Sequence, residues 1–82
     1  MGTTYERTNI TNGKIIVVEW YEASSNRMGG DYYNTYTFDK ISEALESYTV
    51  GCYADAIMHD LCKKYPHQAD TLMAKYEDWK KK

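Results

Sequence analysis

The sequence predicts a small α+β domain in which an antiparallel sheet is followed by helices. Residues 14–21 contain four consecutive β-branched residues and two aromatic ones, and only this stretch would be apolar on both faces of an extended chain, as is typical of a central strand. Asn12-Gly13, directly before it, is the strongest short signal for a β-hairpin. The second half of the chain repeats apolar residues at helical spacing. We therefore expect a small antiparallel three-stranded sheet, made of a hairpin and a third strand, followed by three helices packed on one face.

The hairpin turn leaves two registers open. A two-residue turn at Asn12-Gly13 would set Glu6 directly opposite Glu19, and like charges in that position destabilise a sheet. A turn with Gly13 in a left-handed bulge position would shift the register by one residue and separate the two carboxylates. The residues alone do not distinguish these registers.

A third strand and three helices follow the hairpin. Residues 32–38 alternate in the way that predicts a strand, and Asp39 after them is suited to cap a helix. The main core helix is expected at 54–65, and Pro66 is well placed in the first turn of the last helix. On the first helix, the apolar face is expected to consist of Ile41, Ala44, Leu45 and Tyr48.

The central strand has two apolar faces, and one layer of helices covers only one of them. The face expected to carry the helices consists of Ile16, Val18 and Trp20. The other face consists of Ile15, Val17 and Tyr21. Together with tyrosines of residues 32–38, this second face would form an exposed patch, and such patches mark interaction sites. A fourth strand or a dimer across the sheet is the alternative cover.

The composition favours protein binding over nucleic-acid binding. Nine tyrosines among 82 residues exceed what a small core holds, and tyrosine is enriched on contact surfaces. The net charge of −2 disfavours binding to duplex nucleic acid, because such proteins neutralise phosphates with clustered basic residues. Single-stranded nucleic acid, whose bases could stack on exposed tyrosines, is the weaker alternative.

The chain is expected to be one cytoplasmic domain, residues 1–82, with no membrane partner. It has neither an apolar leader nor an apolar run of the roughly 20 residues that span a bilayer. Cys52 and Cys62 are ten residues apart near or within one predicted helix, which separates them by roughly 15 Å, whereas a disulfide requires less than about 7 Å. We therefore expect free thiols.

No group of residues predicts catalysis, a metal or a cofactor. Asp55, His59 and Cys62 share one helical stripe, but a catalytic thiol and its base normally converge from different elements across a cleft. A zinc site could instead be drawn from Cys52, His59, Cys62 and His67, yet neither the cysteines nor the histidines have the close spacing of zinc ligands. The expected function is therefore not enzymatic.

The expected function is that of a non-catalytic protein-binding module. Residues 23–31 are rich in small, polar and glycine residues and predict a long loop beside the sheet, and contact residues concentrate on such loops. The residues expected to bind the partner are Tyr21, Arg27, Met28, Tyr33 and Tyr36.

Phe38-Asp39 ends a strand, and the Leu-Glu-Ser of residues 45–47 lies in the helix after it. In this pattern, and in its size, mild acidity, tyrosine content and order of elements, the chain resembles small phage-encoded inhibitors of bacterial defence, the anti-CRISPR proteins among them. The resemblance implies a viral protein that acts in the host cytoplasm as a stoichiometric inhibitor of a larger protein or nucleoprotein complex. The alternative is a small homodimeric structural or assembly subunit that pairs through its sheet face.

Overall fold

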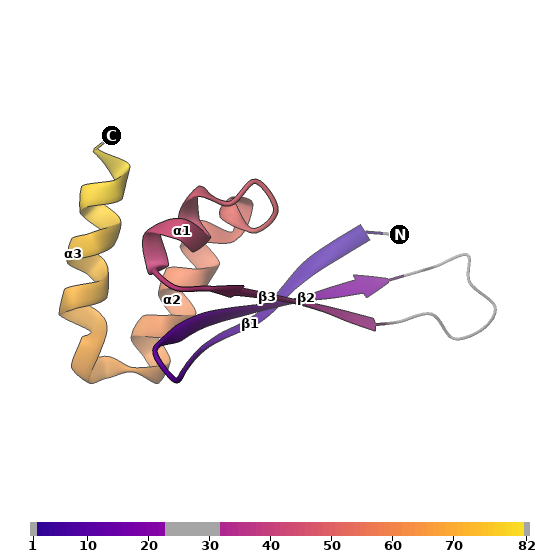
Figure 1. The fold of residues 1–82 in the computed structure, drawn as a ribbon, viewed down its shortest axis with the longest axis horizontal. Coiled ribbons are helices and arrows are strands. Elements are labelled where there is room, and N and C mark those ends of the chain that lie inside the picture. The colour runs from indigo at the N-terminus through magenta and orange to yellow at the C-terminus, as the bar shows by residue number, and fades with distance from the viewer. Residues whose placement is uncertain (1, 23–31, 82) are drawn as a thin grey trace.

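The computed structural model describes residues 2–22 and 32–81. The elements are β1 (Gly2–Thr11), β2 (Lys14–Glu22), β3 (Tyr32–Phe38), α1 (Ile41–Glu46), the 3₁₀ turn η1 (Gly51–Tyr53), α2 (Ala54–Lys64), the 3₁₀ turn η2 (Pro66–Gln68) and α3 (Ala69–Lys80). The strands form one antiparallel sheet in the order β1-β2-β3, and the helices gather at one end of it (Figure 1). The predicted three-stranded sheet followed by three helices is confirmed.

The hairpin combines a two-residue turn with a bulge further along β1. Asn12 and Gly13 have φ angles of 52° and 76°, and two successive positive φ values belong to the type I′ turn. The register then shifts at Glu6, so that Glu19 lies opposite Tyr5. The two-residue turn is therefore correct, and the bulge keeps the carboxylates of Glu6 and Glu19 from facing each other.

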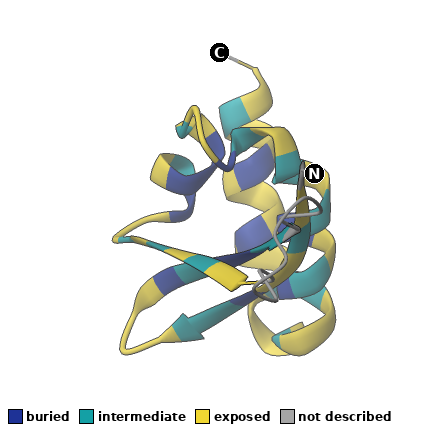
Figure 2. Ribbon diagram, turned by 90° about the vertical axis from the view of Figure 1, so that its right-hand side faces the viewer, coloured by how far each residue is buried: buried dark blue, intermediate teal, exposed yellow. Residues whose placement is uncertain are grey.

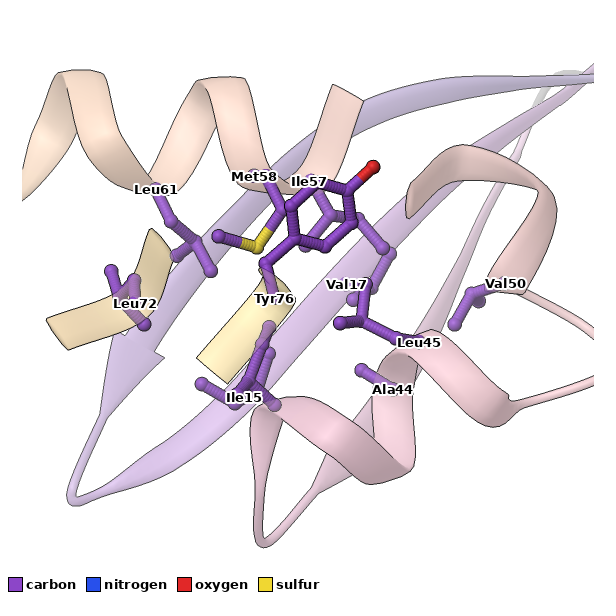
Figure 3. Close-up of a cluster of buried hydrophobic side chains, with 11 residues drawn as sticks. Ile15, Val17, Ala44, Leu45, Val50, Ile57, Met58, Leu61, Leu72 and Tyr76 are labelled. Atoms are coloured by element: carbon purple, nitrogen blue, oxygen red, sulfur yellow. The ribbon is translucent and has the colours of Figure 1, made fainter. Parts of the chain in front are cut away.

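The helices cover the face of β2 opposite to the one expected. Ile15 and Val17 are 5% and 0% exposed and point into the core, where they meet side chains of α1 and α2 (Figure 3). The prediction that Ile16, Val18 and Trp20 carry the helices is wrong. The core residues are Ile15, Val17, Ile41, Ala44, Leu45, Val50, Ile57, Met58, Leu61, Leu72 and Tyr76. In Figure 2 the buried positions lie where strands and helices face each other.

The neighbouring strands explain this choice of face. Ile15 lies between Ile10 of β1 and Phe38 of β3, so this row is apolar across the whole sheet. Ile16 lies between Asn9 and Thr37, whose side chains are polar. Because burial stabilises in proportion to the apolar area removed from water, the face that contains a row apolar on all three strands binds the helices.

The first helix is shorter than expected and is not capped by Asp39. Its N-cap residue is Lys40, which makes no side-chain capping bond. The Asp39 carboxylate instead accepts a hydrogen bond from Lys14 Nζ, and its backbone N–H donates to Glu43 Oε1 at 3.1 Å. The helix ends at Glu46, so Tyr48 lies beyond it and is fully exposed instead of packing on its apolar face.

The connection from α1 to α2 depends on a glycine. The N–H of Gly51 donates to the carbonyl oxygen of Ser47 at 2.7 Å. A Cβ at this position would lie 2.7 Å from the backbone carbonyl oxygen of Leu45, which is closer than non-bonded atoms approach. The missing side chain therefore allows the turn that brings the fully buried Val50 into the core.

The outer edge of β1 is closed by polar side chains from the end of α2. Asp60 Oδ2 accepts a hydrogen bond from the N–H of Thr8 at 2.8 Å, and Lys64 Nζ donates to the carbonyl oxygen of Thr8 at 3.0 Å. The hydroxyl of Tyr65 accepts from the N–H of Ile10 at 2.9 Å. These bonds satisfy backbone groups that an edge strand would otherwise present to other chains.

We predict that Ile57→Ala lowers the free energy of unfolding by about 2–5 kcal/mol. Ile57 is 0% exposed at the centre of the core, and truncation leaves a cavity. Met73→Ala, at a position of α3 that is 38% exposed, is the matched control and should change the free energy by about 0.5 kcal/mol or less. Urea unfolding followed by circular dichroism measures both. Equal effects of the two substitutions would contradict the core described above.

Candidate functional site

Two aromatic pairs occupy the end of the sheet that extends beyond the helices (Figure 1). In the register of β2 and β3, Trp20 lies opposite Tyr33 and Tyr21 lies opposite Tyr32. We call these four residues the aromatic tip. Tyr32 and Tyr33 are 50% and 57% exposed, so the tip presents large aromatic surface that the rest of the described chain does not cover.

The aromatic tip has two sides. Side chains alternate along a strand, so Tyr21 and Tyr32 lie on the side of the sheet that carries the helices. Their rings stack with a centroid distance of 5.0 Å and an interplanar angle of 29°. Trp20 and Tyr33 lie on the other side. The aromatic tip therefore presents aromatic side chains on both faces of the sheet.

The side of the sheet opposite the helices continues from the tip as the open face. Its residues, in rows across the strands, are Thr4, Trp20 and Tyr33; Arg7, Val18 and Thr35; and Asn9, Ile16 and Thr37. Val18 in the middle row is 5% exposed although it lies on this face. The strands on either side of β2 contribute mostly polar side chains to this face. Its apolar surface is therefore a single line of side chains along β2, from Ile16 through Val18 to Trp20.

A buried carboxylate, Glu19, lies next to the tip on the helix side. It is 5% exposed. Its Oε2 accepts a hydrogen bond from the hydroxyl of Tyr53 at 2.7 Å. Its Oε1 accepts from Tyr36 Oη and Asn34 Nδ2, both at 3.1 Å. Because Tyr53 belongs to η1, this carboxylate ties the helical layer to the sheet directly behind the aromatic tip.

The hydrogen bonds keep Glu19 ionised. Burial by itself raises the pKa of a carboxyl group, but the bonds from Tyr53, Asn34, Tyr36 and Thr3 outweigh it, and the pKa of Glu19 lies below its ordinary value. The pKa values of the Tyr53 and Tyr36 hydroxyls are raised, first by burial and further by the bond to this carboxylate. Both tyrosines therefore stay protonated and act as donors at neutral pH.

A second carboxylate, Asp60, also has a structural role. Besides the N–H of Thr8, its Oδ2 accepts from the Tyr5 hydroxyl at 2.9 Å and lies 3.2 Å from Lys64 Nζ. Burial raises its pKa, but the bonds from Thr8, Tyr5 and Lys64 outweigh this effect, and the pKa is lowered. A hollow of about 470 Å³ between β1 and α2 is lined by Asp60, Lys64 and His59 among others. The ionised groups of Asp60 and Lys64 are already bonded to the protein.

The structure separates the residues expected to bind a partner. Tyr21 and Tyr33 belong to the aromatic tip, on opposite sides of it. Tyr36 lies outside the tip on the helix side, where its ring packs against the core and its hydroxyl donates to Glu19. Arg27 and Met28 lie outside the described residues.

Trp20 and Tyr32 complete the aromatic tip but are not among the residues expected to bind a partner. Trp20 is expected under the helices, and Tyr32 only as one of the tyrosines that could join the exposed patch. Their signal is the pairing of residues that flank the 23–31 segment: in an antiparallel pair the two aromatic residues before it face the two after it.

The residues weighed for catalysis do not converge. Asp55 accepts a hydrogen bond from the Tyr76 hydroxyl, His59 is exposed, and Cys62 packs against the core. Cys52 and Cys62 are free thiols. Within residues 2–22 and 32–81, no group of three or more His, Cys, Asp or Glu side chains is placed to hold a metal ion.

Comparison with protein-family models, with curated proteins and with solved structures gave no match. The function of the chain therefore has to be argued from its own residues. None of the helices in the described part of the chain has both the length and the apolar character that crossing a bilayer requires.

We predict that Glu19→Gln lowers the free energy of unfolding at pH 7 by about 1–3 kcal/mol, because charge-assisted hydrogen bonds from three side chains are weakened. A carboxyl group with a lowered pKa stabilises the fold above its unfolded pKa, and this contribution is lost as the pH falls through the folded value. The wild type should therefore lose stability below about pH 5 more steeply than the variant. Urea unfolding at several pH values measures the difference.

Glu77→Gln serves as the control for this comparison, since Glu77 is an exposed residue of α3. Its stability should follow the wild type across the whole pH range. Parallel pH curves for Glu19→Gln and the wild type would show that Glu19 does not contribute through its charge.

Proposed function

We propose that this chain is a non-catalytic protein-binding module that docks its aromatic tip onto a larger protein. The observation that supports this proposal most is that two cross-strand pairs of aromatic residues lie beyond the helices, with Tyr32 and Tyr33 at least half exposed. Tyrosine and tryptophan dominate the residues that contribute most to protein interfaces, because each buries a large area and also offers a polar group.

The region behind the tip favours rigid presentation of these side chains. Glu19 precedes Trp20 in β2 and is held by hydroxyl and amide donors from three other side chains. Tyr53 among them connects the sheet to the helical layer. A binding surface that is fixed before the complex forms loses less conformational freedom on binding, and this increases affinity.

The charges on the open face favour a protein partner over single-stranded nucleic acid. Arg7 is the basic residue among the nine that define this face, and its guanidinium lies 3.9 Å from the Glu6 carboxylate. Proteins that stack bases on aromatic side chains also track the phosphates with a positively charged groove. The nine residues of the open face include one arginine that could contact a phosphate, and it already lies beside Glu6.

Stoichiometric inhibition is the mode of action that we propose. The aromatic tip is a single sheet layer with aromatic rings on both faces, so it can enter a groove of a larger protein. It would block that groove without catalysing a reaction. The resemblance to small inhibitors of bacterial defence supports a nuclease or a surveillance complex as the partner. Its nucleic-acid path, or a conformational step that it requires, would then be blocked.

We predict that Trp20→Ala and Tyr33→Ala each weaken binding to the captured partner by roughly 30-fold or more, because each removes a central aromatic contact. The immobilised wild-type chain first identifies the partner in a bacterial lysate by mass spectrometry. Dissociation constants are then measured with the purified partner by interferometry.

Tyr48→Ala is the matched control, since it removes an aromatic ring that is fully exposed outside the tip. It should bind as the wild type does. If both tip variants retain wild-type affinity, the aromatic tip is not the binding surface. If the purified chain binds a single-stranded oligonucleotide at low salt and no protein, the proposed class of partner is wrong.

A further inference from the structure

The two edge strands of the sheet differ in how they are protected. β1 carries a bulge and charged residues at Glu6 and Arg7, and side chains of α2 and of Tyr65 after it bond to its outward backbone groups at Thr8 and Ile10. Proteins use these devices to prevent an edge from pairing with another chain. The other edge, β3, has none of them.

The sequence and register of β3 suit further pairing. Tyr32–Phe38 contains no charged residue, no proline and no glycine, and it pairs with β2 without a shift in register. Thr35 and Thr37 are exposed, and Tyr33 is 57% exposed. In the part of the chain that the structure describes, no hydrogen bond from outside the sheet reaches the backbone of β3.

The bonds on β1 fix which backbone groups of β3 point outward. Neighbouring residues of an antiparallel strand direct their N–H and C=O groups to opposite edges. The backbone groups of Thr8 and Ile10 bond outward to side chains of α2 and Tyr65, so those of Asn9 between them point inward to Ile16. The two neighbours of Ile16 in β2, Ile15 and Val17, therefore direct their backbone groups to β3.

The same alternation continues into β3. Ile15 and Val17 bond to Phe38 and Tyr36, their partners in the register. The remaining residues of β3 direct their N–H and C=O groups away from the sheet. These residues are Tyr33, Thr35 and Thr37.

We propose that β3 pairs in antiparallel fashion with β3 of a second copy of this chain, around a two-fold axis at Thr35. This register sets Thr35 opposite Thr35 and Tyr33 opposite Thr37 of the second copy. All of these residues direct their backbone groups outward, so the pairing forms about six hydrogen bonds. The product is one continuous sheet with three strands from each copy.

The side chains support a second copy as the occupant of this edge. On the helix side, Tyr32 would lie opposite Phe38 of the second copy, and Asn34 opposite Tyr36. On the open face, threonine would lie opposite threonine at the axis. Aromatic and threonine pairs of this kind stabilise antiparallel strands, and no position places like charges opposite each other. The strand is therefore complementary to itself.

The proposed dimer has a defined shape. A two-fold axis through an antiparallel strand pair is perpendicular to the sheet, so the helices of both copies lie on one side and both open faces on the other. The strands run in opposite directions, so the two aromatic tips project from opposite ends. The proposal does not depend on the proposed partner, since the purified chain alone tests it.

The experiment measures the molar mass of the purified chain by sedimentation velocity over a range of concentrations. We expect a reversible dimer for the wild type. Thr35→Lys and Thr35→Glu should each raise the dissociation constant by at least about tenfold, because each sets like charges opposite each other at the axis. An equimolar mixture of the two variants should dimerise again, because opposite charges then meet.

A wild type that stays monomeric up to millimolar concentration would overturn the proposal. So would a dimer that persists in both charge variants, since it would use another surface. Failure of the mixture to dimerise would place the axis elsewhere and also refute the pairing.

Cysteine cross-linking tests the register without adding charge. In a background with Cys52→Ser and Cys62→Ala, Thr35→Cys should form a disulfide between copies, because directly paired residues have Cα atoms about 5.5 Å apart. Thr37→Cys is the control: the two copies of residue 37 would be about 14 Å apart along the strands and should not cross-link. Equal cross-linking of both variants would contradict the register.

Discussion

β2 is apolar on both faces, but residues 2–22 and 32–81 supply a single layer of helices to cover it. The row of Ile10, Ile15 and Phe38 decides which face is buried, because it is apolar on all three strands. Once Ile15 and Val17 are buried, Val18 and Trp20 necessarily point away from the helices. The open face and the aromatic tip follow from this choice.

Polar contacts hold the sheet to the helices beyond the reach of the apolar core. Glu19 lies on the buried face beyond the apolar rows, and hydroxyls from η1 and β3 hold it there. Asp60 and Lys64 close the edge of β1. The described side chains that remain with large aromatic exposure on the sheet, Tyr32 and Tyr33, lie at its projecting end and on the unprotected strand β3. Binding to a partner and pairing with a second copy would thus use surfaces that the helices leave uncovered.

The sequence predicted the elements but not the face of the sheet that they cover. Asn12-Gly13, the 32–38 alternation and the helical spacing after Pro66 are local signals, and each corresponds to an observed element. The buried face is not a local signal, because it carries the carboxylate of Glu19. That carboxylate can be buried because Tyr36 and Tyr53 supply hydrogen-bond donors from elsewhere in the chain. Tyr36, which is expected to bind a partner, is one of these two donors.

The position of the helices on the Ile15 and Val17 face of β2 can be measured by nuclear Overhauser effects between assigned methyl groups. We expect strong effects from the methyl groups of Ile15 and Val17 to side chains of the helical core such as Leu45 and Ile57, and none from Ile16 or Val18 to any helix. Effects from Val18 to Ile57, with none from Val17, would show that the helices bind the opposite face and that the open face is misplaced.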